Sequence, residues 1–234
     1  MVRQFFIVIL VLTSQALMAQ EGKDILRKHF KAHGQDLWKE MNSVIVDGKW
    51  VDADYHSYPM KLTYKYPGKI RLEGTYQNKR FAEATDGQLS WIIAPWKPRY
   101  EVQLMSTAEE IVIKNSFSRG SPLYPVKDHL TFLGLSDMEG ILYYTYLMEE
   151  ASFRRTFYID QKDFRLYYEK IESKFDGTPI SVLKTIEKYK QYNGLLVPTA
   201  VYFKGDDFER ELVFDEIYVG MGANDDLFQM PNGQ

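Results

Sequence analysis

The spacing of apolar residues along the chain first changes near Ser43. Before that point, Asp24–Met41 has apolar residues at helical spacing, interrupted by Gly34. This pattern predicts a helix that ends near His33 and is followed by a short turn. From Ser43 onward, apolar residues recur at every second position between polar or charged ones, which is typical of amphipathic β-strands.

Short turn sequences separate the strands predicted in the first half, namely Pro67-Gly68, Gln77-Asn78 and Asp86-Gly87. Loops of this length join antiparallel neighbours. The period of two returns after a segment with Pro122 and Pro125, which we expect to be irregular. The later strands are predicted over Ile141–Glu149, Phe153–Ile159, Phe164–Ser173, Ile180–Tyr189, Leu196–Phe203 and Glu209–Val219. The two halves together predict about eleven strands.

A second helix is predicted between the two sets of strands. Ser106 and Glu109 have the spacing of a capping box, and the helix should include Ile111 and end before Gly120. No Pro-, Gly- or Ser-rich linker separates the halves, so we expect one domain over residues 20–234. The predicted fold is mainly β (α+β), with a single antiparallel sheet that should curl into a barrel or half-barrel, because so many twisted strands rarely stay flat.

The first nineteen residues have the features of a signal peptide. Arg3 precedes the apolar run Phe5–Leu12, and Ala19 is an acceptable cleavage residue, so we expect the mature chain to start near Gln20. The apolar run is too short to span a bilayer, which needs about 20 residues. We therefore expect the mature protein to be soluble outside the cytoplasm.

The amino-acid composition disfavours or excludes several classes of function. Of the 234 residues, 29 are Lys or Arg and 32 are Asp or Glu, and the basic residues are scattered, which disfavours nucleic-acid binding. The chain has no cysteine, so disulfides, thiolate nucleophiles and cysteine metal sites are excluded. Neither a G-x-S-x-G elbow nor a glycine-rich phosphate loop occurs, so the sequence lacks the motifs of serine-elbow hydrolases and of nucleotide-phosphate sites.

Two histidines have a spacing that zinc sites use. His29 and His33 lie four residues apart on the predicted helix, but Phe30 stands where a zinc-protease motif has glutamate. Since no third ligand is evident, we expect no metal and interpret both as solvent-exposed side chains. The apolar strand face remains, and the alternation alone fits an ordinary core as well as it fits a ligand cavity.

Several short motifs, in their order and spacing, resemble one family. They are Lys65–Arg71 with its central Pro-Gly, Thr85–Gly87 followed by Trp91, Tyr192–Pro198, and the closing Asp226–Pro231. The chain resembles the LolA/LolB-like outer-membrane lipoprotein carrier superfamily, specifically its outer membrane lipoprotein-sorting proteins. The resemblance covers essentially the whole mature chain and implies an incomplete β-barrel lidded by helices, whose apolar interior shelters acyl chains.

The resemblance also implies a periplasmic carrier rather than an enzyme, with no catalytic residues and no cofactor. Its ligand would be the acyl chains of lipoproteins or another lipid, its partners would lie at the inner and outer membranes, and we expect a monomer engaged in lipoprotein transport. Residues two apart on a strand share a face, so we expect the lipid-binding side chains on one concave face. They are Met60, Leu62, Tyr64, Tyr66, Ile70, Leu72, Trp91, Ile93, Leu142, Tyr144, Phe157 and Ile159.

One position departs from the family pattern. Tyr66 stands where the best-studied carriers have an arginine that helps to hold the empty lid shut. The locked state of those carriers is therefore not assured for this chain. Two alternatives to a carrier remain: a sensor of the same fold that signals to a membrane partner, and an exported hydrolase, which would need convergent polar groups inside the cavity.

Overall fold

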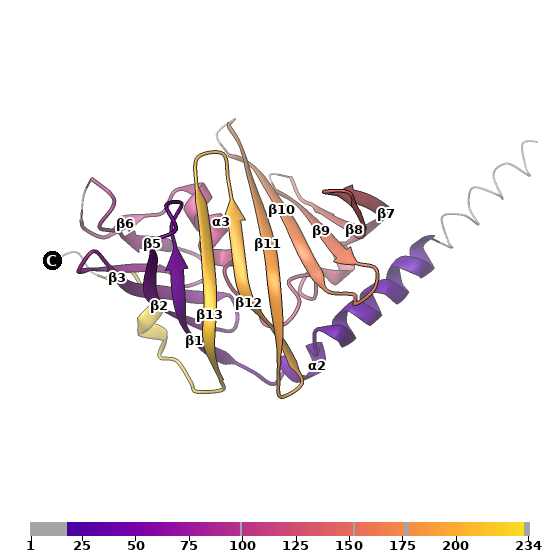
Figure 1. The fold of residues 1–234 in the computed structure, drawn as a ribbon, viewed down its shortest axis with the longest axis horizontal. Coiled ribbons are helices and arrows are strands. Elements are labelled where there is room, and N and C mark those ends of the chain that lie inside the picture. The colour runs from indigo at the N-terminus through magenta and orange to yellow at the C-terminus, as the bar shows by residue number, and fades with distance from the viewer. Residues whose placement is uncertain (1–17, 99, 152, 176–177, 232–234) are drawn as a thin grey trace, which may run out of the picture.

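The structure is a computed structural model that describes residues 18–98, 100–151, 153–175 and 178–231. The predicted signal peptide lies outside the described residues, except for Met18 and Ala19, which belong to a helix that runs to residue 32. This N-terminal helix lies beside the sheet (Figure 1). No helix among the described residues has the length and apolar character needed to cross a bilayer.

The strands form one 13-stranded sheet in which every pairing is antiparallel. The strands before the central connection are β1 (Ser43–Val51), β2 (Ser57–Lys65), β3 (Lys69–Tyr76), β4 (Lys79–Thr85), β5 (Ser90–Ile93) and β6 (Gln103–Leu104). Those after it are β7 (Thr131–Met138), β8 (Ile141–Glu149), β9 (Phe153–Asp160), β10 (Leu166–Phe175), β11 (Thr178–Tyr192), β12 (Leu195–Lys204) and β13 (Glu209–Val219).

The sheet is a curled, open strip whose middle is the pairing of the first strand with the last. Its order runs from β6 down to β1, then from β13 down to β7, so β6 and β7 are its two edges. The chain passes from one edge to the other through α3 (Thr107–Asn115) and the short 3₁₀ helix η1 (Lys127–His129). Because α3 contacts β3 and β4 on one side and β11 on the other, it spans the hollow of the curled sheet (Figure 1). This architecture confirms the predicted incomplete barrel with helices over its inner face.

Local chemistry explains several boundaries. Gln77 and Asn78 both have positive φ, 47° and 65°, as a tight hairpin turn between β3 and β4 requires. The capping box before α3 is present, with Ser106 and Glu109 bonded reciprocally. Gly34 has a φ of 64°, and a Cβ there would lie 2.4 Å from the carbonyl oxygen of Gly194, so the chain needs glycine at this turn.

The strand count exceeds the sequence prediction by two. β6 has two residues, which is too short to show a period, and β7 lies in the segment that we expected to be irregular. Burial alternates along β7, but Leu133 and Leu135 occupy exposed positions while Gly134 and Ser136 occupy half-buried ones, so its apolar residues do not mark the inner face. The predicted turn after His33 contains a further short helix, α2 (Gln35–Trp38).

Candidate functional site

The inner face carries two apolar clusters. The first lies over β1–β4 and β10–β13, beneath α3, and is completed by Phe117 of the segment that follows α3. Met60, Leu62, Ile70 and Leu72, all expected to bind lipid, are buried in it. These side chains therefore pack as a core in the closed structure.

The second cluster lies over β8–β11, beneath the N-terminal helix. Phe157 and Ile159 are fully buried there, Tyr144 packs at its margin, and Leu26 and Phe30 of the helix cover it. Leu142 lies at the exposed start of β8, with 48% of its surface accessible. Eight of the twelve predicted residues thus fall in two clusters with separate helical covers.

Trp91 and Ile93 lie on the outer face of the sheet, so their expected position on the concave face is wrong. Residues directly opposite on neighbouring strands share a face. Trp91 is opposite Ala84 and Ile93 is opposite Ala82, whereas the inner residue Leu72 is opposite Glu83.

The C-terminal segment covers Trp91 and Ile93 on the outer face of the sheet. Both β5 residues form a small cluster with Ala82, Ala84 and Met230. The indole Nε1 of Trp91 donates to the carbonyl oxygen of Phe228, 3.0 Å away, in the 3₁₀ helix η2 (Asp225–Phe228). The C-terminal segment therefore buries an outer apolar strip that alternation alone cannot distinguish from an inner one.

A cavity of about 480 Å³ opens beside the first cluster, between the β2–β3 turn and the segment after α3. Its apolar walls include Tyr64, Ile70 and Phe117, and Tyr66 lies at its margin with 49% of its surface accessible. Three of the twelve predicted residues, Tyr64, Tyr66 and Ile70, therefore reach this cavity. Two more open hollows, of about 690 and 680 Å³, flank the N-terminal helix.

Tyr66 has a guanidinium beside it, which comes from Arg119 in the segment after α3. The guanidinium carbon of Arg119 lies 3.6 Å from the centre of the Tyr66 ring, a cation–π contact. Its Nη1 also donates to the carbonyl oxygens of Lys39 and Met41, at 3.4 and 3.5 Å, just beyond α2. Arg119 therefore ties the segment after α3 to the β2–β3 turn and to the chain beyond α2.

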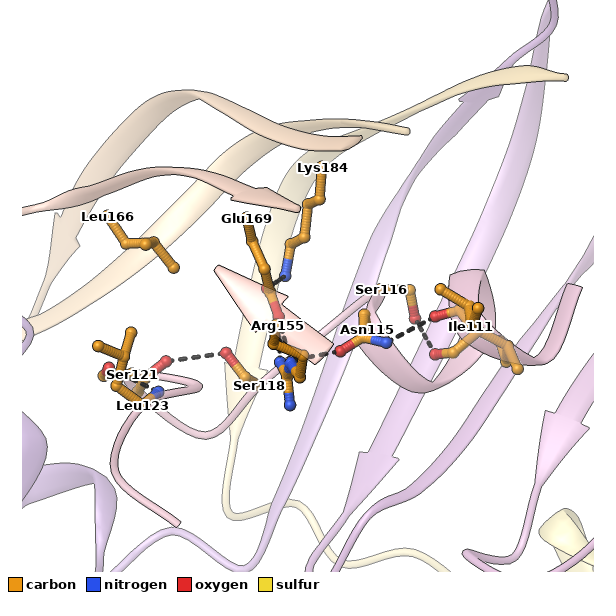
Figure 2. Close-up of polar contacts among 12 residues, drawn as sticks. Ile111, Asn115, Ser116, Ser118, Ser121, Leu123, Arg155, Leu166, Glu169 and Lys184 are labelled. Carbon is orange, nitrogen blue, oxygen red and sulfur yellow. Dashed lines mark hydrogen bonds and ion pairs between the residues drawn. The ribbon is translucent and has the colours of Figure 1, made fainter. Parts of the chain in front are cut away.

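The interior also contains buried charges that the sequence analysis missed. Arg155 on β9, Glu169 on β10 and Lys184 on β11 point toward one another (Figure 2). The Nε of Arg155 donates to Glu169 Oε1 at 2.7 Å, and its Nη2 also bonds to that oxygen and to Asn115 Oδ1, the latter at 3.1 Å. The Nζ of Lys184 lies 3.6 Å from Glu169 Oε2.

Burial and charge compete in this cluster. Burial would raise the pKa of Glu169, but the adjacent Arg155 and Lys184 charges outweigh it, so this pKa is below its ordinary value. Burial lowers the pKa of Lys184, and attraction to Glu169 offsets only part of that effect. A second inner pair, Arg210 and Glu83, is bidentate, with contacts of 2.6 and 2.8 Å.

The two helix histidines are buried, so the expectation that they are solvent-exposed is wrong. His29 Nδ1 donates to the carbonyl oxygen of Phe164 at 2.8 Å, which leaves Nε2 to accept from the Ser121 hydroxyl at 2.6 Å. The backbone N–H of Leu166 donates to Nε2 of His33 at 3.4 Å. Burial lowers the pKa of His29 to about 4 and that of His33 well below its ordinary value.

The contact between His29 and Ser121 has the distance of a nucleophile and its base. However, Ser121 is 1% exposed, and its Oγ also accepts from the backbone N–H of Leu123 at 3.1 Å. Ser121 is among the residues that line the 480 Å³ cavity, but its hydroxyl is engaged by these two partners and almost none of its surface is exposed. The pair instead fastens the N-terminal helix to the segment that crosses the sheet.

The described residues include one group with metal-ligand spacing, formed by Asp52, Asp54 and His56. Its ligand atoms lie within 4.8 Å of one another. Asp52 Oδ1 accepts from the backbone N–H groups of Asp54 and His56, which accounts for the arrangement as a capped turn. At the other candidate pair, both ring nitrogens of His29 are occupied by protein groups.

The fold and its inner face define a class: an open antiparallel half-barrel whose hollow is covered by short helices. No family model matches the chain, and no curated protein does. Among solved structures, the chain is similar to a LolA superfamily protein from Nitrosomonas europaea, with a TM-score of 0.57 and 15% identity over 88% of this chain and 96% of that one.

It is also similar to a DUF1329 family protein from Desulfovibrio piger, with a TM-score of 0.56 and 11% identity over 88% of this chain and 97% of that one. At these identities, the similarity concerns the fold. The LolA-like fold is therefore confirmed.

Proposed function

We propose that the protein is an exported, periplasmic carrier that binds the acyl chains of lipoproteins or lipids and helps to deliver them towards the outer membrane. The observation that carries this proposal is the 480 Å³ cavity beside a buried apolar cluster, within a LolA-like fold. Cavities for small ligands typically have about 300–1,000 Å³ and mostly apolar walls. We propose binding without chemistry, because the hydroxyl of the His29–Ser121 pair at the cavity wall is buried and already holds two hydrogen bonds.

The covers of the two clusters indicate how an acyl chain would be accommodated. α3 and Phe117 cover the first cluster, and the N-terminal helix covers the second. Displacing either cover would expose apolar surface, which an acyl chain would then bury again. The cavity lies where the first cover meets the β2–β3 turn, so the acyl chain would begin there, against Tyr64 and Ile70.

Native mass spectrometry of the purified exported protein tests this proposal, together with displacement of a fluorescent 16-carbon fatty acid. We expect co-purified lipid and saturable binding. Ser118→Trp should fill the cavity from its wall and abolish most uptake, whereas Ser57→Trp, at an exposed site on β2, should leave it unchanged. Absence of saturable binding, or equal binding by both variants, would contradict the carrier.

The contact between His29 and Ser121 raises a second candidate, an exported hydrolase. A fluorophosphonate probe labels serine nucleophiles that are activated by a base. We expect no labelling of Ser121 in the folded protein, because the hydroxyl is enclosed. Labelling that disappears in Ser121→Ala would favour the hydrolase over the carrier.

A further inference from the structure

The walls of the 480 Å³ cavity carry basic side chains and no acidic ones. Lys114, Arg119, Arg155 and Lys184 all line it, and neither Asp nor Glu is among its lining residues. In a chain with 29 basic and 32 acidic residues, this local excess of cations does not follow from composition.

The partners of these four cations divide them into an outer and an inner pair. At the rim, Lys114 forms an ion pair with Glu110 of its own helix. Arg119 binds backbone carbonyls and stacks on the Tyr66 ring.

Deeper in, Arg155 and Lys184 share a single carboxylate, Glu169 (Figure 2). With two cations and one anion, this inner cluster has a net charge of +1. The two basic side chains are 15% and 4% exposed, and the carboxylate is 0% exposed.

The shared carboxylate does not fully satisfy both cations. Arg155 takes Oε1 of Glu169, while Lys184 lies 3.6 Å from Oε2, which is longer than a hydrogen bond. Oε2 itself has no hydrogen-bond partner, so the carboxylate of this cluster gives Lys184 an ion pair but no hydrogen bond. A buried positive charge is unfavourable unless an anion or hydrogen-bond acceptors offset it, so the site is electrostatically suited to one more anion.

We propose that the cavity is selective for amphiphiles with an anionic head group, a carboxylate or a phosphate monoester, held by Arg155 and Lys184. This inference rests on the proposed carrier function and names its ligand class. The head group would occupy the inner, basic end of the cavity, and the acyl chain would lie against Tyr64, Ile70 and Phe117. A carboxylate would come from a fatty acid, and a phosphate from a lysophospholipid or from free phosphate.

Ligands that share one acyl chain but differ in head group measure the contribution of the head group, and free anions tested alone distinguish the sources. Affinities of the exported protein would be measured by displacement of the fluorescent fatty acid for palmitate, palmitoyl lysophosphatidate and the neutral monopalmitoylglycerol, which share one acyl chain. Acetate and inorganic phosphate would be tested alone. We expect at least about tenfold tighter binding of an anionic amphiphile than of the neutral one, the ratio that one charge-assisted hydrogen bond supplies.

Two substitutions change the charge of the inner cluster in opposite directions. Lys184→Met leaves Arg155 and Glu169 paired and brings the cluster to neutrality, and it should reduce anionic affinity about tenfold while leaving the neutral ligand unchanged. Lys188→Met removes the same charge from an exposed site on the same strand and should change neither affinity. Glu169→Gln should instead strengthen anionic binding.

Each outcome bears on the proposal. Equal affinities of the wild-type protein for anionic and neutral amphiphiles would overturn the head-group selectivity but leave the carrier intact. Loss of both affinities to the same extent in a folded Lys184→Met variant would also overturn it. Binding of acetate or phosphate alone, with no preference among the amphiphiles, would show a free-anion site. No binding of any amphiphile would refute the carrier itself. If Lys184→Met does not fold, the wild-type selectivity and Glu169→Gln decide the question.

Discussion

Acidification should loosen the N-terminal helix, because this helix is docked by two buried neutral histidines. His29 and His33 are 0% and 2% exposed, and their ring centres are 4.4 Å apart. His29 Nε2 accepts the hydrogen bond from Ser121, so a proton on that nitrogen would break the contact. The perturbation to apply is a decrease in pH from 7 to 5.

The magnitude follows from the pKa of His29. Burial lowers it from the ordinary value of 6.5 to about 4, and the hydrogen bond to Phe164 opposes this only in part. Between these two values the unfolded chain binds a proton that the folded chain does not, so the contribution is complete above pH 6.5 and is lost as pH falls toward 4. His29 alone should remove about 2 kcal/mol from the free energy of unfolding between pH 7 and pH 5. His33 acts in the same direction.

Urea unfolding at a series of pH values measures this loss. In His29→Gln the difference between pH 7 and pH 5 should shrink by about 2 kcal/mol, whatever the stability of the variant at pH 7. His129→Gln, at an exposed site, should keep the wild-type difference. The paired carboxylates contribute chiefly below this window, because the ordinary pKa values of Asp and Glu are near 4. An unchanged pH dependence in His29→Gln would refute the reasoning.

Three further substitutions test the inner face of the sheet, its outer face and the contact between Arg119 and Tyr66. Ile70→Glu puts a charge at the cavity wall and should abolish acyl-chain uptake, whereas Thr75→Glu, exposed on the same strand, should not. Tyr66→Arg places a second guanidinium beside Arg119 and should accelerate hydrogen exchange over residues 116–121, while equal protection would show that the stacking is unimportant. Trp91→Ala should destabilise the fold by about 3–5 kcal/mol yet preserve uptake in protein that remains folded, because its side chain lies on the outer face.

The period of two predicted most of the sheet because it is a local property of the chain. Each hairpin needs only a turn and two alternating strands, and the turn at Gln77 and Asn78 has the positive φ values expected of its residues. β6 and β7 were missed for equally local reasons, since β6 has two residues and β7 has Leu133 and Leu135 at exposed positions and Gly134 at a half-buried one. Both lie at the sheet edges, where one partner strand suffices.

Which face of a strand is buried, by contrast, depends on which distant segments of the chain cover it. Trp91 alternates as an inner residue would, but the C-terminal segment covers it from outside through Phe228. The spacing of His29 and His33 indicates a shared side of the helix and cannot say whether that side meets solvent or Phe164. In both cases the deciding contact spans more than 130 residues of sequence.

The positions of the buried charges could have been predicted from the alternation of the strands alone. Lys184 lies between Val182 and Ile186, and Arg155 lies two residues before Phe157, so each charge occupies an inward position of an otherwise apolar row. A charged residue at such a position must find a partner or a ligand, since an unpaired buried charge is unfavourable. The sequence could thus indicate that the interior is polar at these points. Which strand supplies the opposite charge depends on the register that sets Glu169 beside Lys184, and that register is fixed only when the sheet assembles.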